Sequence, residues 1–261
     1  MKLTPRPVRR RPWRDSAAVG VATLTLLAAF SVDWIGLAID HFGPPAVTMR
    51  EAYAAEPDGP TFDHAPFTKL LARHVRPGGW VDYAGLTKDV TVLDRYLAAL
   101  ADAPVDAMGR NEKLALLINA YNAFTLKLIV EHYDGGRLKS IRDIPEAQRW
   151  DAVRWQVGEH TWSLNQIEHE QIRPRFKEPR IHWALVCAAV SCPPLRHEAY
   201  TAEKLDKQLA AQAKYVHTHE RFLRYDEGAN TIHLTPLYRW YDGDFEQASG
   251  SVRAHVATHL A

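Results

Sequence analysis

The longest periodic segment of the chain, from about Asn111 to Tyr133, places the strongest constraint on the fold. Apolar side chains recur there at helical spacing, and the pair Gly135-Gly136 ends the pattern. A helix with an apolar stripe packs that stripe against other elements of the protein. The segment therefore favours a helix-dominated domain. Its stripe consists of Leu114, Leu117, Ile118, Tyr121, Thr125 and Leu128.

The rest of the chain predicts shorter helices and two hairpins. Alternating runs interrupted by turn residues indicate hairpins over 153–162 and 222–235, and Trp80–Tyr83 is a short strand candidate. The apolar run Ile181–Cys187 fits either a strand or the start of a helix. These patterns predict one α+β domain over 67–261, rich in helix, with short antiparallel hairpins. The expected helices cover 67–75, 88–101, 111–133, 164–173, 201–217 and 249–260.

The N-terminal residues 1–42 have the pattern of a signal or membrane anchor. An arginine cluster precedes the apolar stretches Ser16–Val32 and Trp34–Ile39, which together reach the length of a spanning helix. A cleaved signal is the alternative, with Ala52-Tyr53-Ala54 as its cleavage pattern. Residues 43–66, rich in Pro, Ala, Gly and Asp, are expected to be a linker. Both alternatives predict a periplasmic or otherwise extracytoplasmic domain, attached to the membrane only through the N-terminal segment.

Composition limits the classes of partner. A hydrophobic fraction of 46% and a charged fraction of 24% are typical of a globular protein. The net charge is +1, and the positive charge is concentrated at the N-terminus, so we expect no nucleic-acid partner. The sequence has no glycine-rich loop that would cradle a phosphate, and we expect no cofactor. A peptide or small-molecule ligand is the expected partner.

Two asparagines in the long helix call for a specific hydrogen-bonding role. Asn119 and Asn122 lie on one helical face. Asparagine is a poor residue inside a helix because its amide competes with the backbone. In one interpretation these amides tie down neighbouring loops. In the other they orient a catalytic group or a substrate.

The segment 164–173 carries the most unusual polar pattern. Helical spacing places Glu168 on the apolar face with Leu164 and Ile172, where it must find a partner or have its pKa raised by burial. His169 and Arg173 share the adjoining face with Asn165. This pattern predicts a polar site where the segment meets the core.

The only two cysteines, Cys187 and Cys192, close the central apolar run before Pro193 and Pro194. They fit a disulfide, which an oxidising compartment permits. They also fit a cysteine nucleophile with His169 or His182 as base and Glu168 or an asparagine as orienter. A zinc site is disfavoured, because the spacing is wider than C-x-x-C and no second pair exists. We therefore expect no metal.

Taken together, these motifs resemble the "domain of unknown function 547" (DUF547) family. The resemblance covers about 67–245 and rests on Asn119-Ala-Tyr-Asn122, on Ile167-Glu168-His169 within 164–173, and on His182-Trp-Ala-Leu-Val-Cys187 leading to Ser191-Cys192-Pro193. Trp240-Tyr241 followed by Asp244-Phe245 also contributes. The family has no established reaction. The resemblance implies that Asn119, Asn122, Glu168, His169, Arg173 and Cys187 occupy its characteristic positions. Because some members carry serine in place of the second cysteine, it favours Cys187 as the functional cysteine.

The expected function is a thiol-dependent hydrolase or acyl transferase with papain-like or transglutaminase-like logic, acting on envelope peptides or amides. Cys187 would be the nucleophile, His169 the base, and Glu168 or Asn119 the orienting group. Asn122 would be the oxyanion donor. A non-catalytic envelope binding or scaffold module is the alternative. The remaining residues expected to contact substrate are Arg173, His182, Ser191 and Trp240.

Overall fold

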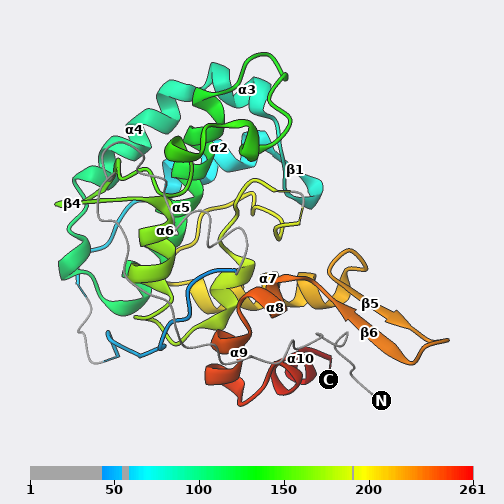
Figure 1. Cartoon of the computed structure of the whole chain (residues 1–261). Helices are drawn as coiled ribbons and strands as arrows, with labels where there is room; N and C mark the ends of the chain where they lie inside the picture. Colours follow the sequence, from blue (N-terminus) through cyan, green and yellow to red (C-terminus); the bar gives the residue numbers. More distant parts are fainter. Residues whose placement is uncertain (1–42, 55–58, 190, 261) are drawn as a thin grey trace, which may run out of the picture.

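The computed structural model describes residues 43–54, 59–189 and 191–260 (Figure 1). The expected signal or anchor, 1–42, lies outside these residues. The described chain begins with an extended segment, 43–54, which lies across the domain before the first labelled helix, α2 (Ala65–His74). The described parts of the expected linker, 43–66, are hydrogen-bonded to the domain, for example through the N–H groups of Arg50, Ala52 and Phe62.

The predicted long helix is α5 (Arg110–Glu131), and the core is built around it. Most of its residues are buried, including Asn119 and Asn122. It is the only helix in the described part of the chain that is long and apolar enough to cross a membrane. However, 89% of its most apolar window is buried inside the protein. The helix is therefore apolar because it is a core helix, surrounded by other elements on all sides.

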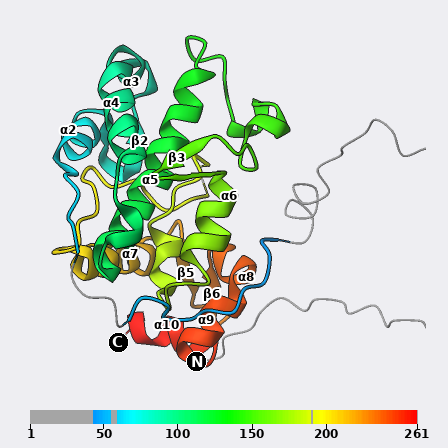
Figure 2. The ribbon, with the colours of Figure 1, turned by 90° about the vertical axis from the view of Figure 1, so that its left-hand side faces the viewer.

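The other helices form two groups around α5. Helices α2, α3 and α4 contribute with α5 to the main apolar core. Helices α7, α8, α9 and α10 contribute to a smaller apolar cluster around Trp183. Figures 1 and 2 show α5 between these groups, with α9 and α10 at the opposite end of the domain from α3 and α4. Beyond α2 and α5, the α-helices are α3 (Tyr83–Lys88), α4 (Val90–Ala101), α6 (Leu164–Gln166), α7 (Leu205–Thr218), α8 (Leu237–Trp240), α9 (Asp242–Ser249) and α10 (Val252–Leu260).

The described strands form three separate antiparallel pairs and no larger sheet. The predicted hairpin 153–162 is β3 (Trp155–Val157) with β4 (His160–Trp162), and the second is β5 (Leu223–Asp226) with β6 (Thr231–Leu234). The latter projects from the body of the domain (Figure 1). A third, very short pair joins β1 (Val75–Arg76) to β2 (Trp80–Val81) around the turn at 77–79. The predicted helix-rich α+β character with short antiparallel hairpins is confirmed.

Two segments near the expected site differ from a simple helix or strand. The helix predicted over 164–173 begins as α6 but continues as a π-helical turn, η5 (Ile167–Ile172). The central apolar run is neither a strand nor an α-helix. A 3-10 helix, η6 (Pro179–Trp183), leads into a series of turns. Side chains of neighbouring helices bind the peptide groups of this run, so it does not need a strand partner.

Candidate functional site

The π-helical turn η5 brings the predicted polar residues into one buried group. The backbone N–H of Arg173 donates to the carbonyl of Glu168 (2.9 Å), five residues earlier, which is the bond of a π-turn. Ser163 caps the start of this segment, where its hydroxyl accepts from the N–H of Gln166. Arg173 and His169 then lie one turn apart, with 3.1 Å between Nη1 and Nδ1.

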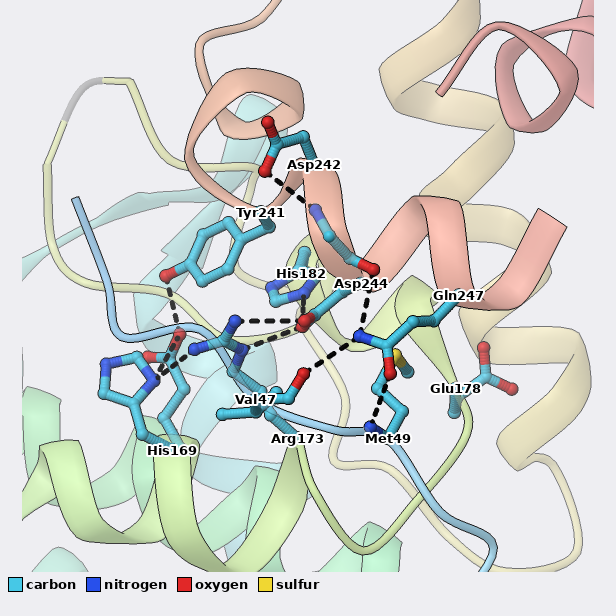
Figure 3. Close-up of polar contacts among 12 residues, drawn as sticks. Val47, Met49, His169, Arg173, Glu178, His182, Tyr241, Asp242, Asp244 and Gln247 are labelled. Carbon is cyan, nitrogen blue, oxygen red and sulfur yellow. Dashed lines mark hydrogen bonds and ion pairs between the residues drawn. The ribbon is translucent and has the colours of Figure 1, made fainter. Parts of the chain in front are cut away.

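Asp244 is the centre of this polar cluster (Figure 3). Its carboxylate accepts two hydrogen bonds from the guanidinium of Arg173, at 2.8 and 3.0 Å, and lies 2.8 Å from Nε2 of His182. The side chains of Arg173 and Asp244 are each only 2% exposed. Burial alone would raise the pKa of Asp244, but the hydrogen bonds from His182 and Arg173 outweigh it and hold that pKa below its usual range. The carboxylate is therefore ionised at neutral pH.

A second carboxylate, Glu168, lies next to the same arginine. Its Oε1 accepts a hydrogen bond from the hydroxyl of Tyr241 (2.6 Å). Burial opposes its ionisation, yet the hydrogen bond from Tyr241 and the positive charge of Arg173 help to hold its pKa below the usual range. Burial also lowers the pKa values of His169 and His182, so both imidazoles are neutral at neutral pH. The cluster thus holds two carboxylates against one guanidinium.

The segment 43–54 covers this cluster. The carbonyl of Pro45 accepts a hydrogen bond from Nη1 of Arg173 (2.8 Å), and Gln247 of α9 bonds to the backbone of Val47 and Met49 (Figure 3). Glu51 forms a bidentate pair with Arg110 at the start of α5, at 2.7 and 3.0 Å. These contacts bind the segment to three elements that are distant in sequence.

The cysteines lie outside the polar cluster. Cys187 and Cys192 form a disulfide, so the sulfur of the expected nucleophile is bonded to its neighbour. Among the described residues, no hydrogen bond or ion pair joins Cys187 to His169, His182 or Glu168. Both imidazoles instead bond within the cluster, to Arg173 and Asp244.

The two asparagines bind the backbone of two different loops. Asn119 accepts from the N–H of Tyr200 (2.9 Å) and donates to its carbonyl (2.8 Å). Asn122 does the same for the run that leads to the disulfide, where it accepts from the N–H of Val186 (2.9 Å) and donates to the carbonyl of Ala184 (3.0 Å). Each amide therefore binds its loop through one N–H and through its oxygen.

A cavity of about 290 Å³ lies beside the disulfide. Asn122, Thr125 and Leu126 of α5 form one wall, and the segments 186–189 and 192–195 form another. The turn at 77–79 forms a further wall of the cavity, where Gly79 packs closely against Pro194. Gly79 has φ +79°, and a Cβ there would lie 2.5 Å from Cα of Pro194. Ala188 also adopts a left-handed φ of 57°, a strained conformation for alanine at the wall of the cavity.

The predicted site residues therefore fall into separate places. Glu168, His169, Arg173 and His182 meet in the polar cluster, and Asn122 lines the cavity with the disulfide loop. Asn119 lies one turn away, at the Tyr200 loop. Ser191 and Trp240 are exposed, and Trp240 is 40% exposed at the end of α8.

Sequence reasoning did not identify several residues of these sites. Tyr241 and Asp244 were noted only as part of a motif, although Asp244 is the main partner of the cluster. The cavity is completed by residues from three regions that are distant in sequence, and nothing local brings them together: Trp80 of β2, Tyr83 of α3, Lys139 and Arg221. Among the described residues, no group of histidine, cysteine and acidic side chains is placed to hold a metal ion.

Comparison with known proteins confirms the family resemblance. Residues 105–216 match the model of the family described as "Protein of unknown function, DUF547". This range includes α5, the π-turn, η6 and the disulfide loop. No curated protein and no solved structure matches the chain.

Proposed function

From the premise that the chain carries a DUF547 region, we propose that this protein is an extracytoplasmic binding module. Its ligand, a peptide or a small molecule, would occupy the cavity beside the disulfide. The observation that carries the proposal is the cavity itself, which is walled by the disulfide loop and by α5. Its volume of about 290 Å³ is close to the lower end of small-molecule sites, about 300 Å³.

The way the cavity is built supports a preformed binding site. Asn122 fixes the run of turns before the disulfide, and Gln212 of α7 donates to the carbonyls of Trp183 and Pro194 (both 2.9 Å). The disulfide closes the loop between these two anchors. A wall that is fixed before binding reduces the conformational entropy that a ligand must offset.

The extracytoplasmic location is part of the proposal. A disulfide between Cys187 and Cys192 is typical of an oxidising compartment such as the periplasm. The N-terminal pattern of arginines followed by apolar residues also favours export of the domain from the cytoplasm. Fractionation of cells that express the full-length protein, with protease added to intact spheroplasts, tests it. Protection of the domain from the protease would contradict export.

Binding is tested by NMR on the full-length, isotope-labelled protein. Two probes that differ only in charge are added, N-acetyl-dialanine and its C-terminal carboxamide. We expect the amide signals of residues at the cavity, such as Val81, Thr125 and Leu195, to shift on addition of at least one probe. Shifts confined to other surfaces, or no shifts at millimolar concentration, would refute the proposed site.

A thiol-dependent hydrolase or acyl transferase of papain-like or transglutaminase-like fold is a second candidate. One observation favours it: Cys192 lines the cavity, so reduction would place a thiol at the ligand site. A dithiol would first reduce the disulfide and be oxidised itself. A thiolate of the freed pair would then attack the substrate carbonyl and form a thioester as the C–N bond breaks, and the amine would leave with the proton that the base took from the thiol. Water or an acceptor amine would then release the acyl group and return the thiol. His169 would have to leave Arg173 to act as the base.

Turnover after reduction separates the two candidates, because both start from the same disulfide. With iodoacetamide at neutral pH and no reductant, the disulfide predicts no labelling of either cysteine, as read by intact mass. After reduction, the catalytic candidate predicts release of p-nitroaniline from N-acetyl-dialanine p-nitroanilide. It also predicts loss of that activity in one of the variants Cys187→Ser and Cys192→Ser. The binding module predicts no turnover in any of these forms.

A further inference from the structure

The charged residues around the cavity are all of one sign. Lys139 and Arg221 line it, and none of the described residues that line it is an aspartate or a glutamate. The two cations come from loops that are far apart in sequence, before η3 (Ile141–Asp143) and before β5. Such a lining gives the cavity a positive potential, and low-dielectric walls strengthen that potential.

Neither cation is neutralised by a carboxylate in the described part of the chain. Nζ of Lys139 donates to the carbonyl of Gly136 (2.7 Å). The guanidinium of Arg221 lies 5.9 Å from the ring of Trp80 and 5.0 Å from that of Phe222. The nearby carboxylate of Asp143 accepts the backbone N–H groups of Lys139 and Ser140, as the cap of η3, and does not line the cavity.

The remainder of the wall is mainly apolar or already hydrogen-bonded. The amide of Asn122 is occupied by the backbone of Ala184 and Val186, and the hydroxyl of Thr125 donates to the carbonyl of Tyr121 (2.9 Å). A ligand therefore meets two cationic groups that no carboxylate of the described residues pairs with, the aromatic side chains of Trp80 and Tyr83, and an apolar surface. That surface is formed by Val81, Leu126, Val186, Ala188, Pro193, Pro194 and Leu195.

We infer that the ligand of this cavity carries a carboxylate, held between Lys139 and Arg221, and a short apolar body that packs against the disulfide loop. The inference rests on the proposed function and adds the class of ligand. A guanidinium binds a carboxylate with a pair of parallel hydrogen bonds, and an ammonium adds a second charge. Desolvation of a dianion such as phosphate would be more costly in a cavity with this much apolar wall.

Titration calorimetry of the full-length protein tests the inference with three probes. N-acetyl-dialanine carries a peptide carboxylate, its carboxamide is the matched neutral form, and pentanoate is a free small acid. We expect the peptide acid to bind at least tenfold more tightly than its carboxamide. If pentanoate binds as tightly as the peptide acid, the natural ligand is a free small acid. If pentanoate binds much more weakly, the ligand is the carboxylate end of a peptide.

Matched variants locate the effect. Lys139→Met and Arg221→Gln are each expected to weaken binding of the acid about tenfold and to leave binding of the carboxamide unchanged. Lys214→Met on α7 and Arg224→Gln on β5 remove equal charge from exposed positions that do not line the cavity and should change neither. Equal affinity for acid and carboxamide, with NMR shifts at the cavity, would overturn the carboxylate but leave the binding site in place. Absence of binding by all three probes would overturn both.

Discussion

Replacement of Asp244 by asparagine should destabilise the protein strongly. The change keeps the size of the side chain but removes the charge that Arg173 and His182 face. Both charged side chains of the pair are 2% exposed, so water cannot compensate Arg173 when the carboxylate is lost. Loss of one partner from a buried ion pair costs about 3 to 5 kcal/mol. We expect a loss of that size in the free energy of unfolding.

The matched control is Asp134→Asn. Asp134 also pairs with an arginine, Arg137 (3.0 Å), but these side chains are 44% and 84% exposed. Surface pairs contribute about 0 to 1 kcal/mol, so the control should be nearly as stable as the parent. Urea unfolding of the full-length proteins, followed by tryptophan fluorescence, gives both values. If Asp244→Asn cost no more than Asp134→Asn, the polar cluster would not be a stabilising centre of the fold.

Three further predictions concern the loops and the pH dependence. Asn122→Ala should cost about 1 to 3 kcal/mol by urea unfolding, because it leaves a buried carbonyl and a half-buried N–H without these partners. Gly79→Ala should lower the melting temperature, because its Cβ would overlap the backbone of Pro194, whereas Gly243→Ala in α9 meets no neighbour and should have a small effect. Burial lowers the pKa values of His217 and His255 to about 4, below the unfolded value of about 6.5. Their contribution to stability is therefore complete above pH 6.5 and is lost as the pH falls towards 4, with a slope of up to about 1.4 kcal/mol per pH unit for each imidazole. Urea unfolding between pH 7 and 4 should show this loss, reduced when His217 is replaced by glutamine.

The sequence predicted the regular elements well because their patterns are local. The stripe of α5, the glycines after it and the alternation of β3 and β4 each lie within one short stretch of chain. The spacing predicts an α-helix over 164–173 and does not indicate the π-turn, because a single i→i+5 turn within a short segment leaves no repeating pattern in the sequence. The central run was left open between strand and helix. It is neither, because Asn122 and Gln212 from other helices bind its backbone.

The candidate site was predictable only in part. The spacing predicts that Glu168 lies on the buried face, where it needs a partner or has its pKa raised, but it makes no such prediction for Arg173. The partners of these two residues, Tyr241 and Asp244, come from a region more than seventy residues later. The expectation that helix 164–173 lies beside the cysteines rests on no local pattern, because sequence spacing does not fix the distance between the two segments. Both regions contact α5, but through different side chains. Nothing in a local pattern specifies which face of a core helix each segment meets.

The polar cluster and the cavity are nevertheless linked through one short element. His182, held by Asp244, lies in η6, and the same run continues through Ala184 and Val186 to Cys187. Since the peptide groups of this run are bonded to α5 and its imidazole to α9, a shift of η6 would move the wall of the cavity. The arrangement assigns the buried histidine a positioning role: it fixes the loop from one end while the disulfide closes it at the other. A substitution in the cluster should therefore weaken ligand binding as well as stability, although no residue of the cluster lines the cavity.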